Sequence, residues 1–101
     1  MTSDLPHLSS HHRDTLLQIF QHPTSHNVEW HDVLSLLEAT GTVEREHDGK
    51  YYVRLGDDVE VITKPKHKDI EVQGIIDLRR IFIAAGYSEV VKDMEAKGKE
   101  D

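Results

Sequence analysis

The first stretch of the chain with a helical pattern of apolar residues lies between residues 10 and 21. Apolar side chains recur there every three or four positions, and the stripe consists of Leu16, Leu17 and Phe20, with Ile19 at its edge. Ser10 is the expected N-cap, because its hydroxyl can accept a hydrogen bond from a free N–H group of the first turn. Pro23 ends this helix. Residues 1–9 have no periodic apolar set and are predicted to be a frayed terminus.

A second amphipathic helix is predicted over residues 28–40. Its apolar face has the spacing i, i+3, i+4, i+7 and consists of Trp30, Val33, Leu34 and Leu37. Asn27 is the expected cap at its start, and Gly41 ends it. Because this spacing already accounts for Trp30, the indole ring is expected in the core rather than at a ligand.

After Gly41 the period of the pattern changes from 3.6 to 2, which predicts three short β-strands. The three runs are Thr42–His47, Lys50–Leu55 and Val59–Thr63. Asp48-Gly49 separates the first two runs and predicts a tight type I′ hairpin turn, in which both central residues have positive φ. Alternation predicts a buried face made of Val43, Tyr51, Val53, Leu55, Val59 and Val61. The opposite face then carries Lys50, Tyr52, Arg54, Glu60 and Ile62.

A basic loop at residues 64–68 precedes a third helix, which is predicted over residues 71–85 and ends at Gly86. Its packing face consists of Val72, Ile75, Ile76, Leu78, Phe82 and Ala85. The charged segment 88–101 is either a loosely docked helix or disordered. The order α-α-β-β-β-α predicts an α+β domain, in which helices pack on one face of a three-stranded antiparallel meander and leave the other face open.

The composition narrows the classes of function. The chain has 101 residues, a formal net charge of −7, eight histidines and no cysteine. Without cysteine there is no disulfide framework, thiol nucleophile or Cys-ligated metal site. No apolar run approaches the ~20 residues that span a bilayer, and the N-terminus lacks the pattern of a signal peptide, so a cytoplasmic protein is expected. A Gly-rich phosphate loop and a serine elbow are absent as well, and no cofactor is predicted.

The distribution of charge bears on nucleic-acid binding. Residues 30–87 hold 8 Lys or Arg against 11 Asp or Glu, so broad binding to nucleic acid, DNA included, is not expected. A local set of cationic and aromatic residues is nevertheless suited to phosphate and base contacts. This candidate RNA-binding set consists of Lys50, Tyr52, Arg54, Lys64, Lys66, His67 and Lys68. The alternative is a network of cross-strand ion pairs that joins Lys50 and Arg54 to Glu44, Glu46 and Glu60.

An ordered set of residues between Trp30 and Tyr87 carries a family resemblance. The set consists of Asp32-Val33-Leu34-Ser35-Leu36-Leu37 before Gly41, Gly49, Pro65 with His67, Leu78-Arg79-Arg80-Ile81 and Ala85-Gly86. In order and spacing it resembles the HicA family of bacterial toxin–antitoxin ribonucleases. The resemblance implies the fold of double-stranded-RNA-binding domains, with a helix, three strands and a helix. It divides the chain into an extension at 1–24, a HicA-like domain at 25–87 and a charged tail at 88–101.

The resemblance also implies a catalytic histidine, because HicA proteins have a Gly-Ser-His motif at the start of the second strand. Here Gly49 is followed by Lys50 and Tyr51, and neither side chain ordinarily titrates near neutral pH, as a general base should. His47 and His67 are the remaining candidates for proton transfer. The sequence therefore leaves open whether the family's ribonuclease activity is present.

Two further groups of residues are considered, six histidines for metal binding and two arginines for contacts outside the core. The histidines His7, His11, His12, His22, His26 and His31 fit no metal-binding spacing, and no metal site is predicted. Arg79 and Arg80 cannot both face the core, so at least one is expected to reach outward, to Asp77 or to an acidic partner.

The function that the sequence favours is a HicA-like, toxin–antitoxin-related RNA-binding protein with a weak or absent ribonuclease site. The alternative is a protein-interaction module that kept the fold and binds a HicB-like antitoxin or a second copy of itself. Neither hypothesis involves a membrane.

Overall fold

The computed structural model describes residues 7–99, with side chains for residues 7–96. The elements follow in the order α1 (Ser10–Phe20), α2 (Trp30–Thr40), β1 (Thr42–Arg45), β2 (Lys50–Leu55), β3 (Asp58–Thr63), α3 (Val72–Ala84) and α4 (Ser88–Lys99). The strands form one antiparallel sheet in the order β1-β2-β3. The predicted α+β class and meander are confirmed, and the segment after α3 adopts the helical alternative.

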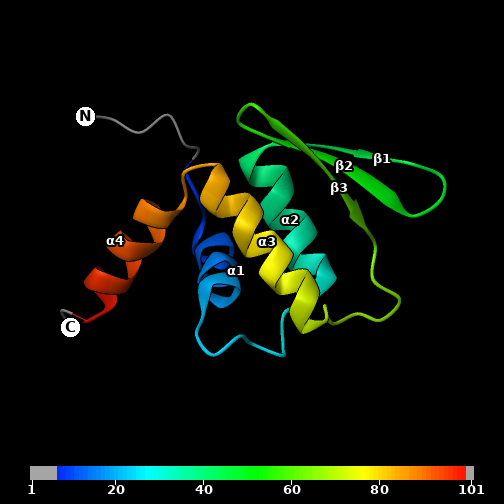
Figure 1. The fold of residues 1–101 in the computed structure, drawn as a ribbon. Coiled ribbons are helices and arrows are strands. Elements are labelled where there is room, and N and C mark those ends of the chain that lie inside the picture. The colour runs from blue at the N-terminus through cyan, green and yellow to red at the C-terminus, as the bar shows by residue number, and fades with distance from the viewer. Residues whose placement is uncertain (1–6, 100–101) are drawn as a thin grey trace.

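The helices all lie on one side of the sheet. Figure 1 shows α2 and α3 beneath the strands and α4 at the far end of the molecule from them. The helix α1 packs against α2, α3 and α4. A single core joins these layers, and its buried apolar residues are Leu8, Leu16, Ile19, Val28, Trp30, Val33, Leu36, Leu37, Tyr51, Val53, Leu55, Ile70, Ile75, Leu78, Phe82, Tyr87 and Val91. Both α1 and α4 therefore contribute to the same core as the sheet.

The start of α1 differs from the prediction by one residue. Ser9, not Ser10, is the N-cap, and its hydroxyl accepts a hydrogen bond from the main-chain N–H of His12 at 3.2 Å. Leu8 is only 5% exposed, so the predicted frayed terminus is wrong at this position, while residues 1–6 lie outside the described part. Capping at Ser9 fixes the chain just before the helix and allows Leu8 to pack into the core.

The buried faces of α1 and α2 are rotated relative to the prediction. In α1, Ile19 is fully buried beside Leu16, whereas Leu17 and Phe20 are half-buried. In α2, Leu36 is fully buried and Leu34 is half-buried. The reason is tertiary, because each of these helices packs against more than one neighbour and its buried surface is wider than a single stripe.

The start of α2 is set by a contact distant in sequence. The predicted helix began at Val28 with Asn27 as its cap, but α2 begins at Trp30 and has Glu29 in the capping position. The preceding residues instead pair with the end of the basic loop: the Ile70 N–H donates to the Val28 carbonyl and the Trp30 N–H donates to the Lys68 carbonyl, both at 2.8 Å. This pairing holds residues 28–29 in an extended conformation, which excludes them from the helix.

The hairpin between β1 and β2 forms with a longer loop than predicted. Residues 46–49 connect the strands, and the Glu46 N–H donates to the Lys50 carbonyl at 2.8 Å. Gly49 has a φ of +82°, but no described residue other than glycine has a positive φ. Asp48 therefore does not adopt the conformation that a type I′ turn requires, and that prediction is wrong.

The register of β3 is the largest departure from the sequence prediction. Leu55 pairs with Asp58, so only Gly56 and Asp57 connect β2 to β3, and Gly56 has a φ of +60°. The prediction assumed a three-residue connection. A change of one residue exchanges the two faces of a strand, so Val59 and Val61 lie on the open face, while Ile62 packs against the core.

Gly86 terminates the helix α3, as predicted. Gly86 has a φ of +94°, its N–H donates to the Ile83 carbonyl, and the Tyr87 N–H donates to the Phe82 carbonyl, both at 3.0 Å. These two bonds form a Schellman motif, which satisfies carbonyls that the helix leaves free. The chain then turns into α4, where Val91 is buried. None of the described helices is long and apolar enough to cross a membrane.

Candidate nucleic-acid interface

The open face of the sheet, called here the outer face, carries part of the predicted RNA-binding set. Lys50, Tyr52 and Arg54 alternate along β2 and point away from the helices, because Tyr51, Val53 and Leu55 between them are buried. The register adds cross-strand neighbours to this face: Thr42 and Glu44 from β1, and Val59, Val61 and Thr63 from β3. The outer face therefore has a cationic and aromatic middle strand beside an apolar edge strand.

Tyr52 is the centre of this face. Its side chain is 39% exposed, and it lies between Glu44 on β1 and Val61 on β3. A shallow hollow of about 100 Å³ is lined by Thr42, Glu44, Tyr52, Arg54 and Val59. An exposed ring beside a small hollow offers a flat surface on which an unpaired base can stack.

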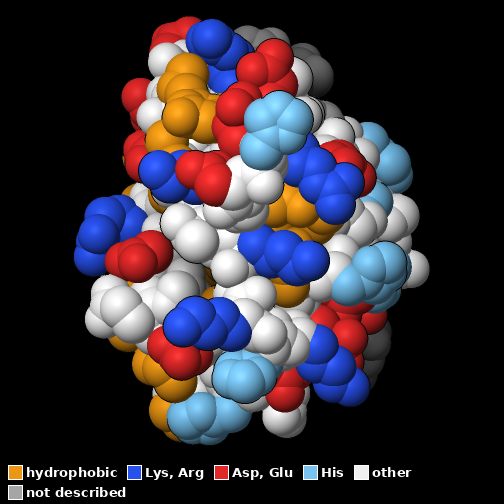
Figure 2. Space-filling view, turned by 90° about the vertical axis from the view of Figure 1, so that its right-hand side faces the viewer, with side chains coloured by type: hydrophobic (Ala, Val, Ile, Leu, Met, Phe, Trp, Pro, Cys, Tyr) orange, Lys and Arg blue, Asp and Glu red, His pale blue; other side chains and the backbone are white. Residues whose placement is uncertain are grey.

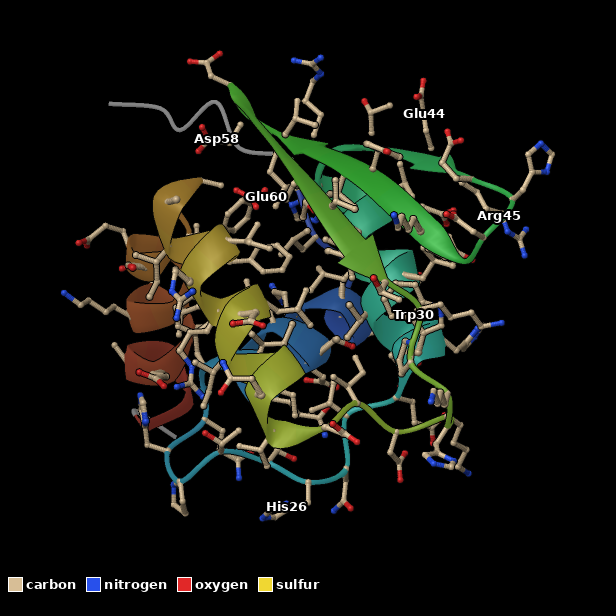
Figure 3. All side chains as sticks on the ribbon, turned by 45° about the vertical axis from the view of Figure 1, so that its right-hand side comes forward. His26, Trp30, Glu44, Arg45, Asp58 and Glu60 are labelled. Carbon is tan, nitrogen blue, oxygen red and sulfur yellow. The ribbon has the colours of Figure 1, made fainter. Side chains whose placement is uncertain are left out.

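The cations of the outer face are largely available for a ligand. Within the described residues, Arg54 makes no ion pair, and the contact of Lys50 is with Asp48 at 3.8 Å, at the half-exposed end of the hairpin. The alternative in which both pair with Glu44, Glu46 and Glu60 is not formed in the described part of the chain. Glu60 in particular lies on the opposite face from the one predicted, since its partner in the ladder is Val53. Figure 3 shows Glu44 above the sheet and Glu60 on the side of the helices.

The basic loop lies on a second surface. A groove of about 990 Å³ runs between β3, residues 64–71 and α3, and Lys64, Lys66 and His67 line it. Glu60, Asp69 and Asp77 also line the groove, so its charge is mixed. Lys68 instead contacts Glu29 at 3.8 Å. The predicted set is thus divided between the outer face and the groove, which adjoin where Lys64 follows β3 and donates its N–H to the Gly49 carbonyl at 2.8 Å.

The positions considered for catalysis have different environments. Tyr51 is buried, with its ring edge-on to Trp30 at 5.1 Å between centroids, whereas Lys50 is exposed. The prediction that Trp30 is a core residue is confirmed. His47 and His67 are both exposed, and within the described residues neither ring hydrogen-bonds to another protein group. The geometry therefore supplies no group that orients either imidazole as a general base.

Two of the remaining histidines join helices. His11 Nε2 contacts the Asp32 carboxylate at 3.1 Å, and His12 Nε2 lies 2.9 Å from the hydroxyl of Ser35. Both contacts connect α1 to α2, and sequence reasoning missed them because the partners are more than 20 residues apart. The described residues contain no group of three or more His, Cys, Asp or Glu side chains that could hold a metal ion.

Arg79 has a role that the sequence did not indicate. Its Nε donates to the Ile19 carbonyl at 2.9 Å, and its Nη2 contacts the Gln21 carbonyl at 3.2 Å and the Thr24 hydroxyl at 3.1 Å. It therefore binds the end of α1. Arg80 reaches outward to Asp77 at 3.7 Å, as predicted.

Charge elsewhere on the surface is mixed. Figure 2 shows Lys and Arg side chains interspersed with Asp and Glu side chains over the face it presents, with no large area of a single sign. Comparisons with protein-family models, with curated proteins and with solved structures found no match to this chain.

Proposed function

We propose that this protein is a HicA-like, toxin–antitoxin-related RNA-binding protein that acts in the cytoplasm and contacts single-stranded RNA with the outer face of its sheet. The observation that supports this most is the exposed ring of Tyr52 between Lys50 and Arg54 on the uncovered outer face of the sheet. An unpaired base stacks on the ring, while the two cations contact the phosphates on either side of it.

The neighbouring residues define the path of the RNA. Val59 and Val61 extend the apolar surface beside the ring, and the carboxylate of Glu44 repels phosphates from the β1 side. The RNA therefore runs along β2 and leaves the sheet near Lys50. Lys64 and Lys66 lie there, because they follow the end of β3. Single-stranded RNA is favoured because a base in a duplex cannot present its face to a side chain.

The proposal gives the protein binding without efficient cleavage. Lys50 and Tyr51 occupy the positions at which the family resemblance implies a catalytic histidine, and Tyr51 belongs to the core. The exposed His47 and His67 have no orienting partner within the described residues. RNA should consequently remain intact in the complex.

The test measures the affinity for a fluorescein-labelled single-stranded RNA of about 12 nucleotides, a length that spans a small binding face. Fluorescence anisotropy at low ionic strength should show binding that Tyr52→Ala weakens by about 5- to 150-fold, since stacking contributes roughly 1–3 kcal/mol per base. Tyr52→Phe keeps the ring and should bind nearly as well as the unmodified protein.

The electrostatic part is tested by salt. The double variant Lys50→Ala/Arg54→Ala should reduce the slope of log affinity against log salt by about 1.4, because each phosphate contact contributes roughly 0.7 on a single strand. Lys92→Ala is the matched control, since Lys92 is an exposed cation on α4. No RNA binding at low ionic strength, or equal effects of the double variant and the control, contradicts the proposal and favours the alternative of a HicB-like protein partner.

A further inference from the structure

The strand β3 lies at the edge of the sheet and has one unpaired side. It pairs only with β2, and the Lys64 N–H continues the ladder by donating to the Gly49 carbonyl. Main-chain groups of alternate residues point to opposite sides of a strand, so Asp58, Glu60 and Ile62 bond to β2. The N–H and C=O groups of Val59, Val61 and Thr63 therefore point outward, and no described main-chain group bonds to them.

Of the features that usually protect such strands, the edge has one, the inward-facing charge of Glu60. Edge strands in stable monomers carry prolines, bulges or inward charges, or are covered by other segments. Within β3 there is no proline, and its register with β2 is continuous from Asp58 to Thr63. Val59 and Val61 are 50% and 52% exposed. On the helix side of the sheet, the groove between β3 and α3 leaves space beside the edge of β3.

The charges along this edge are arranged so that the strand complements itself. Asp57 directly precedes the strand, Asp58 and Glu60 lie in its first half, and Lys64 and Lys66 follow its end. When two such strands run antiparallel, the acidic half of each meets the basic end of the other. A parallel arrangement would instead place like charges side by side, which is destabilising.

We propose that β3 pairs with β3 of a second copy of this chain, antiparallel about a two-fold axis at Val61, to form a continuous six-stranded sheet. In this register Val61 faces Val61 of the second copy, and Val59 faces Thr63 of the second copy. All three outward-pointing residues of each strand then find main-chain partners. Asp58 faces Lys64 of the second copy, and the symmetry repeats this pair.

Neighbouring registers are less favourable. A shift of two residues in one direction places Glu60 opposite Glu60 of the second copy, and like charges directly opposite are destabilising. A shift of two in the other direction places Val59 opposite Pro65, which has no N–H to donate. A shift of one residue would set outward-pointing groups against groups already bonded to β2. The charge pattern and the hydrogen bonds therefore select the same register.

The experiment measures mass in solution by sedimentation equilibrium, at protein concentrations from about 10 μM to about 1 mM, since an interface of one strand pair is small and weak. The mass should rise from that of one chain toward that of two. Val61→Pro should remain monomeric at every concentration and keep its fold, because the lost N–H points outward and proline is tolerated at sheet edges. A mass that stays at one chain for the unmodified protein overturns the proposal.

Charge exchange tests the register independently of proline. Asp58→Lys and Lys64→Asp, each alone, place like charges opposite one another in both symmetric positions, and each variant should be monomeric. An equimolar mixture of the two should form a heterodimer, because at both symmetric positions a lysine of one variant then faces an aspartate of the other. Failure of the mixture to associate, or unchanged association of the single variants, overturns this pairing. Because RNA takes no part in these measurements, their outcome is separate from that of the RNA-binding test.

Discussion

Removal of the Arg79 side chain should destabilise the fold, because this guanidinium connects α3 to the end of α1. It reaches two main-chain carbonyls, those of Ile19 and Gln21, and the hydroxyl of Thr24, at 2.9 to 3.2 Å. The last carbonyls of a helix have no partner within the helix and are favourable positions for a cation. Arg79→Ala leaves these groups without their donor in a partly buried place.

The size of the effect follows from the number and kind of these bonds. A hydrogen bond to a charged group contributes roughly 1.5–3 kcal/mol, and the cation at a helix end adds about 0.3–1 kcal/mol. The three contacts share one side chain that is partly accessible to water, so they do not add fully. We expect Arg79→Ala to lower the free energy of unfolding by about 2–4 kcal/mol. Arg79→Lys should recover about half of the loss, because one ammonium cannot reach all three acceptors.

Urea denaturation followed by circular dichroism measures this difference, with Arg80→Ala as the matched control. Arg80 is the next residue on the same helix, but its side chain is 73% exposed and its ion pair with Asp77 is 3.7 Å long. A surface pair of this kind contributes roughly 0.2–1 kcal/mol. If Arg79→Ala and Arg80→Ala lower the stability equally, the attachment of α1 through Arg79 is refuted.

Two further predictions concern Tyr87 and Gly41. The Tyr87 hydroxyl is buried without a hydrogen-bond partner among the described residues, so Tyr87→Phe should raise the free energy of unfolding by about 1 kcal/mol. Burial also raises the pKa of Tyr87 above its ordinary value of 10.0. The folded protein holds the Tyr87 proton more tightly than the unfolded chain does. The stability that follows from this difference is present below pH 10 and is lost as pH rises through the raised pKa of Tyr87. The unmodified protein should therefore lose stability above about pH 10 faster than Tyr87→Phe, by up to about 1.4 kcal/mol per pH unit, and equal pH profiles would contradict this. For Gly41, a Cβ atom would collide with the Arg54 carbonyl and with the Leu55 side chain, so Gly41→Ala should cost about 1–3 kcal/mol in urea denaturation. Gly74→Ala is the control, since its Cβ would meet one side-chain atom, Ile70 Cγ2, and no main-chain atom, and alanine gains helix propensity; equal losses would exclude the collision at Gly41.

The candidate site was only partly predictable from the sequence. The clean alternation of polar and apolar residues in β2 correctly predicts Lys50, Tyr52 and Arg54 on the open face. The same rule predicts the valines of β3 in the core, since apolar residues in an alternating strand usually face inward. Their true position depends on the two-residue connection after Leu55, and the composition of the strand does not reveal the length of that connection. The free edge of β3 and its self-complementary charges became apparent only with the register.

Local sequence determined the type and order of the secondary structure. The periods of the apolar residues, the glycine after α3 and the change of pattern at Gly41 were sufficient to predict an α+β meander with helices on one face, because these signals act within one or two turns of chain. Tertiary structure decided the faces and the ends. Ile70 pairing with Val28 set the start of α2, the two-residue turn set the register of β3, and Arg79 bound a helix end 60 residues away from it. Each of these depends on groups distant in sequence, whose meeting is fixed only when the whole core packs.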